Sequence, residues 1–155
     1  MELGQAIAKP GGARFGALVH AVLATIPLDA GPHPIEEATE LQARILAAPP
    51  DEAAAGRALV AAALAAPLMM RARAAWADGR CRREAPIAWV EADGVLVEGV
   101  LDLAFEDEGG WTIIDFKTNV ETDSALEQYR RQVGLYAAAV AKATGREARG
   151  FLIQL

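Results

Sequence analysis

Apolar side chains in the first half of the chain recur three and four positions apart, which is the spacing of one helical face. Through the first such segment they are Phe15, Leu18, Val19, Val22 and Leu23. Prolines and glycines separate the segments, and helices are expected over residues 14–25, 35–48, 51–66 and 67–76, with Asp51 capping the third. Residues 1–12 are expected to form a flexible lead-in to this helical region, which covers residues 13–78.

Residues 79–155 follow a different pattern, because apolar and polar positions alternate there as they do in strands. Strands are expected over residues 83–91, 95–105, 111–118 and 149–155, with Gly99 interrupting the second. A helix is expected between the last two strands; it opens with the capping box Ser124-Ala125-Leu126-Glu127 and ends at Gly145. The two halves together predict an α/β fold.

The second and third expected strands carry two acids and a lysine. They are joined by Glu106-Asp107-Glu108-Gly109-Gly110, a polar turn of hairpin length. A hairpin symmetric about Glu108 and Gly109 places Asp102 opposite Asp115, with Cβ atoms about 4.5–5.5 Å apart. Lys117 lies two residues beyond Asp115 and therefore on the same face.

Two carboxylates at this separation repel each other by about 4 kcal/mol at an effective dielectric of about 20, so a compensating cation is expected. A divalent ion fits, because Mg²⁺ takes carboxylates together with water and phosphate oxygens. Lys117 would then stabilise charge or orient a nucleophilic water, which is the chemistry of phosphodiester hydrolysis. The alternative is that both acids are ordinary residues on the solvent-exposed face of a hairpin, although aspartate is depleted in strands.

The formal net charge of −6 disfavours strong DNA binding by the chain alone, since affinity for DNA comes largely from neutralised phosphates. A larger partner is therefore expected to deliver the strand. Basic stretches at Arg71 to Arg83 and at Arg130 and Arg131 are either DNA contacts or solvated faces. The single cysteine, Cys81, excludes an internal disulfide and a four-cysteine zinc or iron–sulfur site.

The sequence carries neither a membrane signal nor an ATP-binding signal. No apolar run reaches the length of a membrane span, and the N-terminus lacks the basic-then-apolar order of a signal peptide. A cytoplasmic location and no membrane partner are expected. There is no Gly-x-x-x-x-Gly-Lys-Ser/Thr loop, so this chain brings no ATP motor of its own.

Five motifs resemble, in their order, those of the RecB/AddA-type nuclease domain, a branch of the PD-(D/E)XK superfamily usually found at the C-terminus of a UvrD-like helicase. They are Phe15-Gly16-Ala17-Leu18-Val19-His20-Ala21, Glu84, Gly99-Val100-Leu101-Asp102, Asp115-Phe116-Lys117-Thr118 and Gln132-Val133-Gly134-Leu135-Tyr136. The resemblance implies a restriction-endonuclease-like fold, with a small mixed central sheet of about four strands flanked by helices. It also implies one domain over residues 1–155, cut from a larger helicase-nuclease, with its nuclease core over residues 79–155.

The resemblance assigns roles to single residues. His20, Asp102 and Asp115 would be the ligands of Mg²⁺ or Mn²⁺, with the backbone carbonyl of Phe116 as a fourth. Lys117 would be the catalytic lysine. Some relatives carry an iron–sulfur cluster around this domain, which one cysteine cannot hold.

Two further elements of the resemblance lie outside this ligand set. Gln132 and Tyr136 match a Gln-x-x-x-Tyr element that lies beside the site and positions the DNA strand or the catalytic residues. Glu84 matches an acidic position whose role is less firmly assigned, and an exposed acid at a strand end is the alternative.

Two hypotheses of function follow. The first is a Mg²⁺- or Mn²⁺-dependent deoxyribonuclease, an exonuclease acting on single-stranded DNA or a duplex end. A parent or partner helicase would deliver that DNA during double-strand-break repair and recombination. The second is a catalytically inert nuclease-like module for DNA-end binding or for assembly with a partner protein. Such modules usually lose an acid or the lysine, and this chain keeps all of them.

Overall fold

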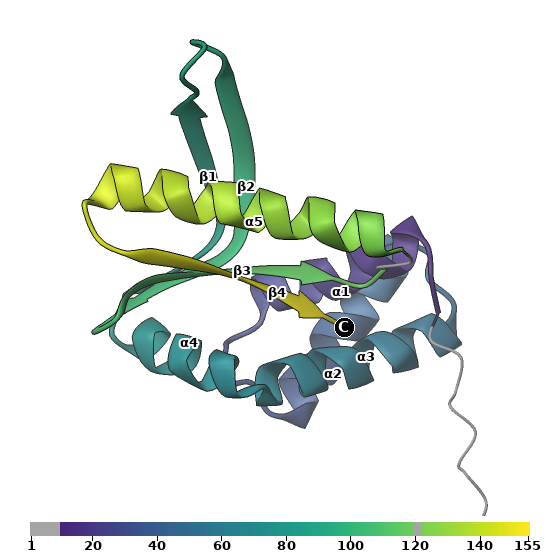
Figure 1. Ribbon diagram of the computed structural model, residues 1–155. Helices are drawn as coiled ribbons and strands as arrows, with labels where there is room; N and C mark the ends of the chain where they lie inside the picture. The colour runs from purple at the N-terminus through teal and green to yellow at the C-terminus, as the bar shows by residue number, and fades with distance from the viewer. Residues whose placement is uncertain (1–9, 120–121) are drawn as a thin grey trace, which may run out of the picture.

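A computed structural model describes residues 10–119 and 122–155, so most of the predicted lead-in lies outside the described residues. Four helices come first: α1 (Ala13–Thr25), α2 (Pro32–Ile45), α3 (Pro50–Ala65) and α4 (Pro67–Ala77). The second half contains β1 (Cys81–Val90), β2 (Leu96–Asp107), β3 (Gly110–Lys117), α5 (Asp123–Thr144) and β4 (Ala148–Gln154). The order of elements agrees with the predicted one (Figure 1).

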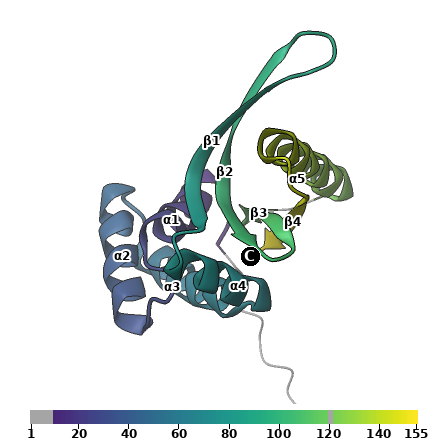
Figure 2. The ribbon, with the colours of Figure 1, turned by 90° about the vertical axis from the view of Figure 1, so that its left-hand side faces the viewer.

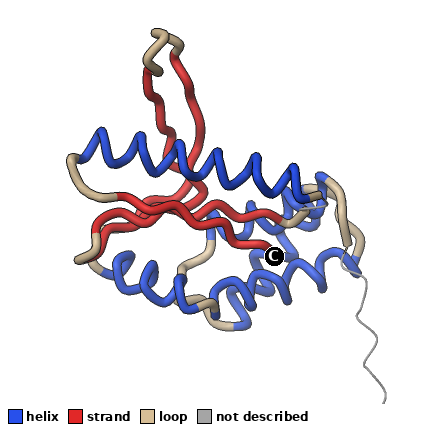
Figure 3. The backbone as a smooth tube through the Cα atoms, viewed as in Figure 1, coloured by secondary structure: helices blue, strands red, loops and turns tan. Residues whose placement is uncertain are grey.

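The four strands form one mixed sheet in the order β1-β2-β3-β4. β2 pairs antiparallel with both β1 and β3, whereas β4 runs parallel to β3. A parallel pair needs a crossover, which α5 supplies. Helix α5 lies over one face of the sheet and α1 to α4 lie on the other side (Figure 3). The predicted α/β fold with a small mixed sheet is confirmed.

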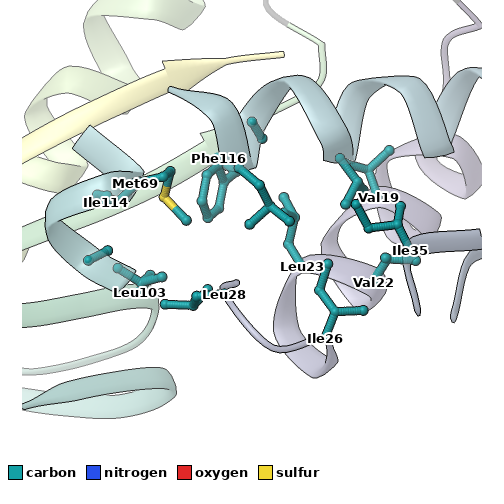
Figure 4. Close-up of a cluster of buried hydrophobic side chains, with 14 of the residues drawn as sticks. Val19, Val22, Leu23, Ile26, Leu28, Ile35, Met69, Leu103, Ile114 and Phe116 are labelled. Carbon is teal, nitrogen blue, oxygen red and sulfur yellow. The ribbon is translucent and has the colours of Figure 1, made fainter. Parts of the chain in front are cut away.

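Two clusters of buried side chains hold these layers together. The helical-side core joins α1 to α4 to one face of the sheet, and Phe15, Leu18, Phe105 and Ile114 in it are fully buried (Figure 4 shows part of it). The α5-side core lies on the other face and contains Leu101, Ala104, Ile113, Val133, Tyr136, Ala137 and Val140. The sheet is therefore covered on both faces where β3 passes between them.

Strand β2 changes face at Asp102. Leu103 and Phe105 belong to the helical-side core, but Leu101 belongs to the α5-side core although it is also odd-numbered. At the same place the β1–β2 ladder skips the pair of Glu84 with Asp102, and Glu84 has a φ of 47°, in the left-handed region. The expected interruption at Gly99 is wrong, because Gly99 pairs with Ile87 in a regular ladder.

Several helix starts differ from the predicted ones. Helix α2 begins at Pro32 rather than residue 35, and α3 begins at Pro50 after the cap residue Pro49, so Asp51 is not its N-cap. A proline is favourable in the first turn because its missing N–H has no partner there in any case. Helix α5 is capped by Thr122, whose hydroxyl accepts from the Ala125 N–H, so the predicted box at Ser124 is two residues late.

Arginines of the first basic stretch make contacts within the helical region and between that region and the sheet. Arg71 contacts Asp107 at 2.6 Å, at the end of β2. Arg73 donates to the carbonyls of Leu28 and Leu64, and Arg83 donates to those of Leu23 and Ile26. These arginines therefore have a structural role, which differs from both predicted alternatives for the stretch, DNA contacts and a solvated face.

Among the described residues, no single helix has both the length and the apolar character of a membrane span. Helices α3 and α4 pass that test only when taken together, and the chain bends by 76° between them.

Candidate functional site

The predicted hairpin register is confirmed along the paired part of β2 and β3. The ladder runs from Asp107 opposite Gly110 to Leu103 opposite Ile114. One residue beyond Leu103, β2 contacts β3 through a side chain instead of its backbone. Asp102 Oδ2 accepts a hydrogen bond from the Phe116 N–H at 2.8 Å. The backbone pairing of β2 with β3 therefore ends next to Asp102.

Asp115 is the most buried acid of this site, with 5% of its surface exposed. Its Oδ2 lies 3.0 Å from Lys117 Nζ, yet among the described residues no hydrogen bond of good geometry reaches this buried oxygen. Burial raises the pKa of Asp115, and the Lys117 ammonium acts against that rise. A buried carboxylate oxygen short of donors is one that a bound cation would satisfy.

Lys117 connects β3 with α5. Its ammonium lies between the Asp115 carboxylate and the ring of Tyr129, 4.8 Å from the ring centroid. Ile113 belongs to the α5-side core, so strand alternation also places Asp115 and Lys117 on the face that α5 covers. The sequence analysis assigned no role to Tyr129. Its position three residues before Gln132 on the same helix could have indicated one.

His20 reaches the site from α1. Its Nδ1 lies 3.7 Å from Asp102 Oδ2, and this neighbouring carboxylate raises the pKa of His20. Gly16, one turn earlier, explains how α1 comes so close. A Cβ on Gly16 would lie 2.9 Å from Thr118 Oγ1, just beyond the end of β3. The structure therefore places His20 beside Asp102 and Lys117 beside Asp115, and the charges of Asp115 and Lys117 also act on His20.

Glu84 lies near the same group. Partial burial raises the pKa of Glu84, the Asp102 charge raises it further, and His20 lowers it. Its left-handed φ coincides with the break in the β1–β2 ladder, and such conformations are often found at functional sites. Glu84 itself is exposed, as the alternative of an exposed strand-end acid expects, so its role in the site stays a prediction.

Gln132 and Tyr136 form a pair further along α5. Gln132 Nε2 donates to the Tyr136 hydroxyl at 3.0 Å, and the Tyr136 ring lies edge-on to Trp89 at a centroid distance of 6.0 Å. A Cβ on Gly99 would lie 2.6 Å from the same hydroxyl. These contacts attach the pair to the β1–β2 hairpin, whereas Asp115 and Lys117 lie at the end of β3.

Comparison with known proteins identifies the family of the chain. The family model of the PD-(D/E)XK nuclease superfamily matches residues 3–155. The chain belongs to the PD-(D/E)XK nuclease superfamily. The membership leaves the roles of single residues as predictions: Asp102 as the separately placed first acid, and Asp115 and Lys117 as the second acid and the lysine of the core signature.

Curated relatives extend the comparison to helicase-nucleases. An ATP-dependent helicase/nuclease protein of Carboxydothermus hydrogenoformans is 37% identical over 62 residues, which are 37% of this chain and 5% of that protein. The protein of the same name from Anoxybacillus flavithermus is 35% identical over 77 residues, which are 44% of this chain and 6% of that protein. The protein of the same name from a Thermoanaerobacter species is 32% identical over 69 residues, which are 42% of this chain and 6% of that protein. The chain thus spans a small fraction of these relatives, and the predicted resemblance is confirmed.

The PD-(D/E)XK site fits a hard divalent ion. In a strand the N–H and C=O of one residue point to the same side, so the Phe116 carbonyl points toward Asp102, as its N–H does. Two carboxylates and a carbonyl are oxygen donors, and Mg²⁺ needs only one or two carboxylates beside waters and phosphate oxygens. Among the described residues, no group of three His, Cys, Asp or Glu side chains already has metal-ligating geometry. The predicted ligands His20, Asp102 and Asp115 therefore do not form a ready three-residue metal site in the described part of the chain, and their role stays a prediction.

Proposed function

We propose that this PD-(D/E)XK domain is a metal-dependent deoxyribonuclease that hydrolyses phosphodiester bonds. The observation that carries the proposal is Asp115, a buried carboxylate with an oxygen short of hydrogen bonds, placed beside a lysine. A structural ion pair would gain from full hydrogen bonding, whereas a metal ligand must keep an oxygen available.

The residues divide the work as follows. Asp102, Asp115, the Phe116 carbonyl and His20 would hold Mg²⁺ or Mn²⁺, which would neutralise the scissile phosphate and activate a water. Lys117 supports the negative charge that develops on the phosphate, from the side facing α5. The hydrogen bond from the Phe116 N–H to Asp102 fixes the first acid relative to β3.

The proposed substrate is a DNA strand that a helicase delivers during double-strand-break repair and recombination. The proposed mode of cleavage is that of an exonuclease. The names of the matched relatives, which combine helicase and nuclease, support this context. The net charge of −6 supports it as well, because a chain this acidic gains from a partner that holds the DNA. We accordingly propose that the chain acts as the nuclease domain of a larger helicase-nuclease.

The test is cleavage of end-labelled linear DNA, single-stranded and duplex, by the purified chain with Mg²⁺, with Mn²⁺ or with a chelator. Cleavage should need the metal and should fall by at least about 10³-fold in Asp115→Asn and in Lys117→Ala. Glu108→Gln, at the exposed turn of the same hairpin, is the matched control and should cleave normally.

Metal binding separates the two roles. Calorimetric titration with Mn²⁺ should show weaker binding to Asp115→Asn but nearly unchanged binding to Lys117→Ala, since only the first variant loses a ligand. Cleavage that survives in Asp115→Asn would contradict the assignment. DNA binding without cleavage, by the chain alone and beside a helicase partner, would instead support the inert module.

A further inference from the structure

A groove of about 380 Å³ lies between the β1–β2 hairpin and α5. The hairpin rises past α5 and away from the rest of the sheet (Figure 2). Trp89, Val97 and Glu98 line the groove from the hairpin, and Tyr129, Arg131 and Tyr136 are among the residues that line it from α5. The volume lies within the range of small-molecule sites.

The groove adjoins the candidate nuclease site through one side chain. The ring of Tyr129 lines the groove and also lies 4.8 Å from Lys117 Nζ. From Tyr129 the helix rises by about 10 Å to Tyr136, which reaches Trp89. A strand with its phosphate beside Lys117 would therefore bring an adjoining nucleotide to the groove.

The lining suits a nucleobase better than a phosphate. Three aromatic rings and two aliphatic side chains, Val97 and Leu135, provide apolar surface. Arg131 is the only cation and Glu98 the only acid among the described residues that line the groove, so it offers a backbone one phosphate contact and no extended basic track. The Gln132 amide adds a hydrogen-bonding group for the edge of a base.

We propose that this groove receives one unpaired base of the strand whose phosphate lies beside Asp115 and Lys117; the inference thus rests on the proposed function. Aromatic side chains bind bases of single strands by stacking on their faces. In a duplex those faces are covered by neighbouring bases, so the groove selects an unpaired base. Trp89, which no motif of the sequence analysis included, is the central stacking residue.

The test is binding of fluorescent single-stranded DNA to the full chain, carried out in an Asp115→Asn background so that the strand stays intact. One set of oligonucleotides lacks a single base at successive positions. Removal of the base at one position should weaken binding on the order of tenfold. Trp89→Ala should weaken binding of the complete strand by a similar factor and should bind complete and abasic strands equally.

Two variants control for folding and for position. Trp89→Phe keeps an aromatic face and should retain most of the base-dependent binding. Trp111→Ala removes an indole that packs on the α5-side core without lining this groove, and it should leave base dependence intact. Thermal melting of each variant identifies any loss of binding that comes from unfolding.

The outcomes distinguish failure of the groove from failure of the proposed function. If the wild-type chain cleaves DNA with metal but removal of a base weakens binding at no position, only the proposal for the groove is overturned. If binding depends on a base at one position but the wild-type chain does not cleave, the proposed nuclease function is overturned and the proposal for the groove stands. The absence of both would overturn both. A free nucleoside monophosphate that displaces the strand at equal concentration would assign the groove to a free nucleotide and overturn the proposal.

Discussion

Asp115 is an acid whose surroundings disfavour its charged form. Burial penalises its charged form, and the Lys117 ammonium only partly offsets this penalty, so the pKa of Asp115 is raised. Its Oδ2 has no well-directed donor among the described residues. A carboxylate held in this way binds a cation readily, but in the absence of the cation it destabilises the fold.

We therefore expect Asp115→Asn to stabilise the metal-free chain while it abolishes cleavage. The amide carries no charge to be desolvated, and each kcal/mol gained should raise Tm by about 2–4 °C. Thermal melting of both proteins in chelator gives the comparison, and added Mg²⁺ should raise the Tm of the wild-type chain only. A lower Tm for Asp115→Asn in chelator would show that the Lys117 ion pair outweighs desolvation.

His20 gives the metal-free chain a dependence on pH. The Asp102 carboxylate raises the pKa of His20 above its ordinary value of 6.5. Protonated His20 thus stabilises the fold fully below pH 6.5, and this contribution is lost as the pH rises through the raised pKa. The free energy of unfolding in chelator should fall over that interval.

His20→Gln isolates this effect, because it removes the titrating group and keeps a polar side chain. Glu84 and Asp115 titrate in the same sense, but from ordinary values of 4.5 and 3.8, so their effect begins at lower pH and remains in the variant. Denaturant unfolding at a series of pH values measures the difference. Equal slopes for wild-type and variant above pH 6.5 would contradict the contact with Asp102.

At the scale of elements, two glycines of α5 and its neighbouring strand β4 differ sharply in their surroundings. A Cβ on Gly150 of β4 would lie 2.7 Å from the Val133 carbonyl oxygen of α5, whereas one on Gly134 of α5 would meet nothing within 4 Å. The first glycine is required by close packing of two backbones. The second only weakens a helix.

Substituting alanine at each position should therefore have opposite effects. Gly150→Ala should destabilise the chain by about 1–3 kcal/mol, because a backbone carbonyl cannot move aside as a side chain can. Gly134→Ala should stabilise it by about 1 kcal/mol through helix propensity. Denaturant midpoints of both variants measure these values, and a loss of stability in Gly134→Ala would contradict the open surroundings of that residue.

The elements also show how far the sequence could predict the structure. The five helices and four strands were predicted because their periodicities are long and regular. The starts of α2, α3 and α5 were misplaced, because proline at a first helical position and the Thr122 cap are local signals that a periodic pattern does not carry. The change of face at Asp102 was also missed, since the odd positions stay apolar on both sides of it.

The site was predicted unevenly for a similar reason. Asp102, Asp115 and Lys117 lie on one hairpin, where register and alternation determine proximity. The approach of His20 depends on tertiary packing of α1 at Gly16, and that of Tyr129 on the crossover helix, so no spacing rule could derive them. The resemblance to a family supplied His20, and nothing in the sequence analysis supplied Tyr129 as a contact of Lys117.

At the scale of the whole molecule, many of the basic side chains are already neutralised by ion pairs. These pairs join Arg14 with Glu52, Arg57 with Glu36, Arg71 with Asp107, Arg80 with Asp78, and Arg146 with Glu106. Their net charges cancel, so they contribute little attraction for a phosphate backbone. Beside the site, Asp115→Asn removes the charged partner of Lys117, and Arg131 lines the groove, so we expect these two cations to supply most of the electrostatic attraction in that variant.

Binding of single-stranded DNA by the chain should accordingly depend only weakly on salt. With about two phosphates neutralised, the slope of log K against log salt should be about −1.4, since each phosphate contributes about −0.7 for a single strand. Fluorescence anisotropy across a salt series in the Asp115→Asn background measures it. Arg131→Gln should make the slope shallower by about 0.7, whereas Arg57→Gln, which loses only a pair with Glu36 on α2, should leave it unchanged. A slope of about −5 in the chain alone would reveal an extended basic track and would remove the reason for a partner that delivers the strand.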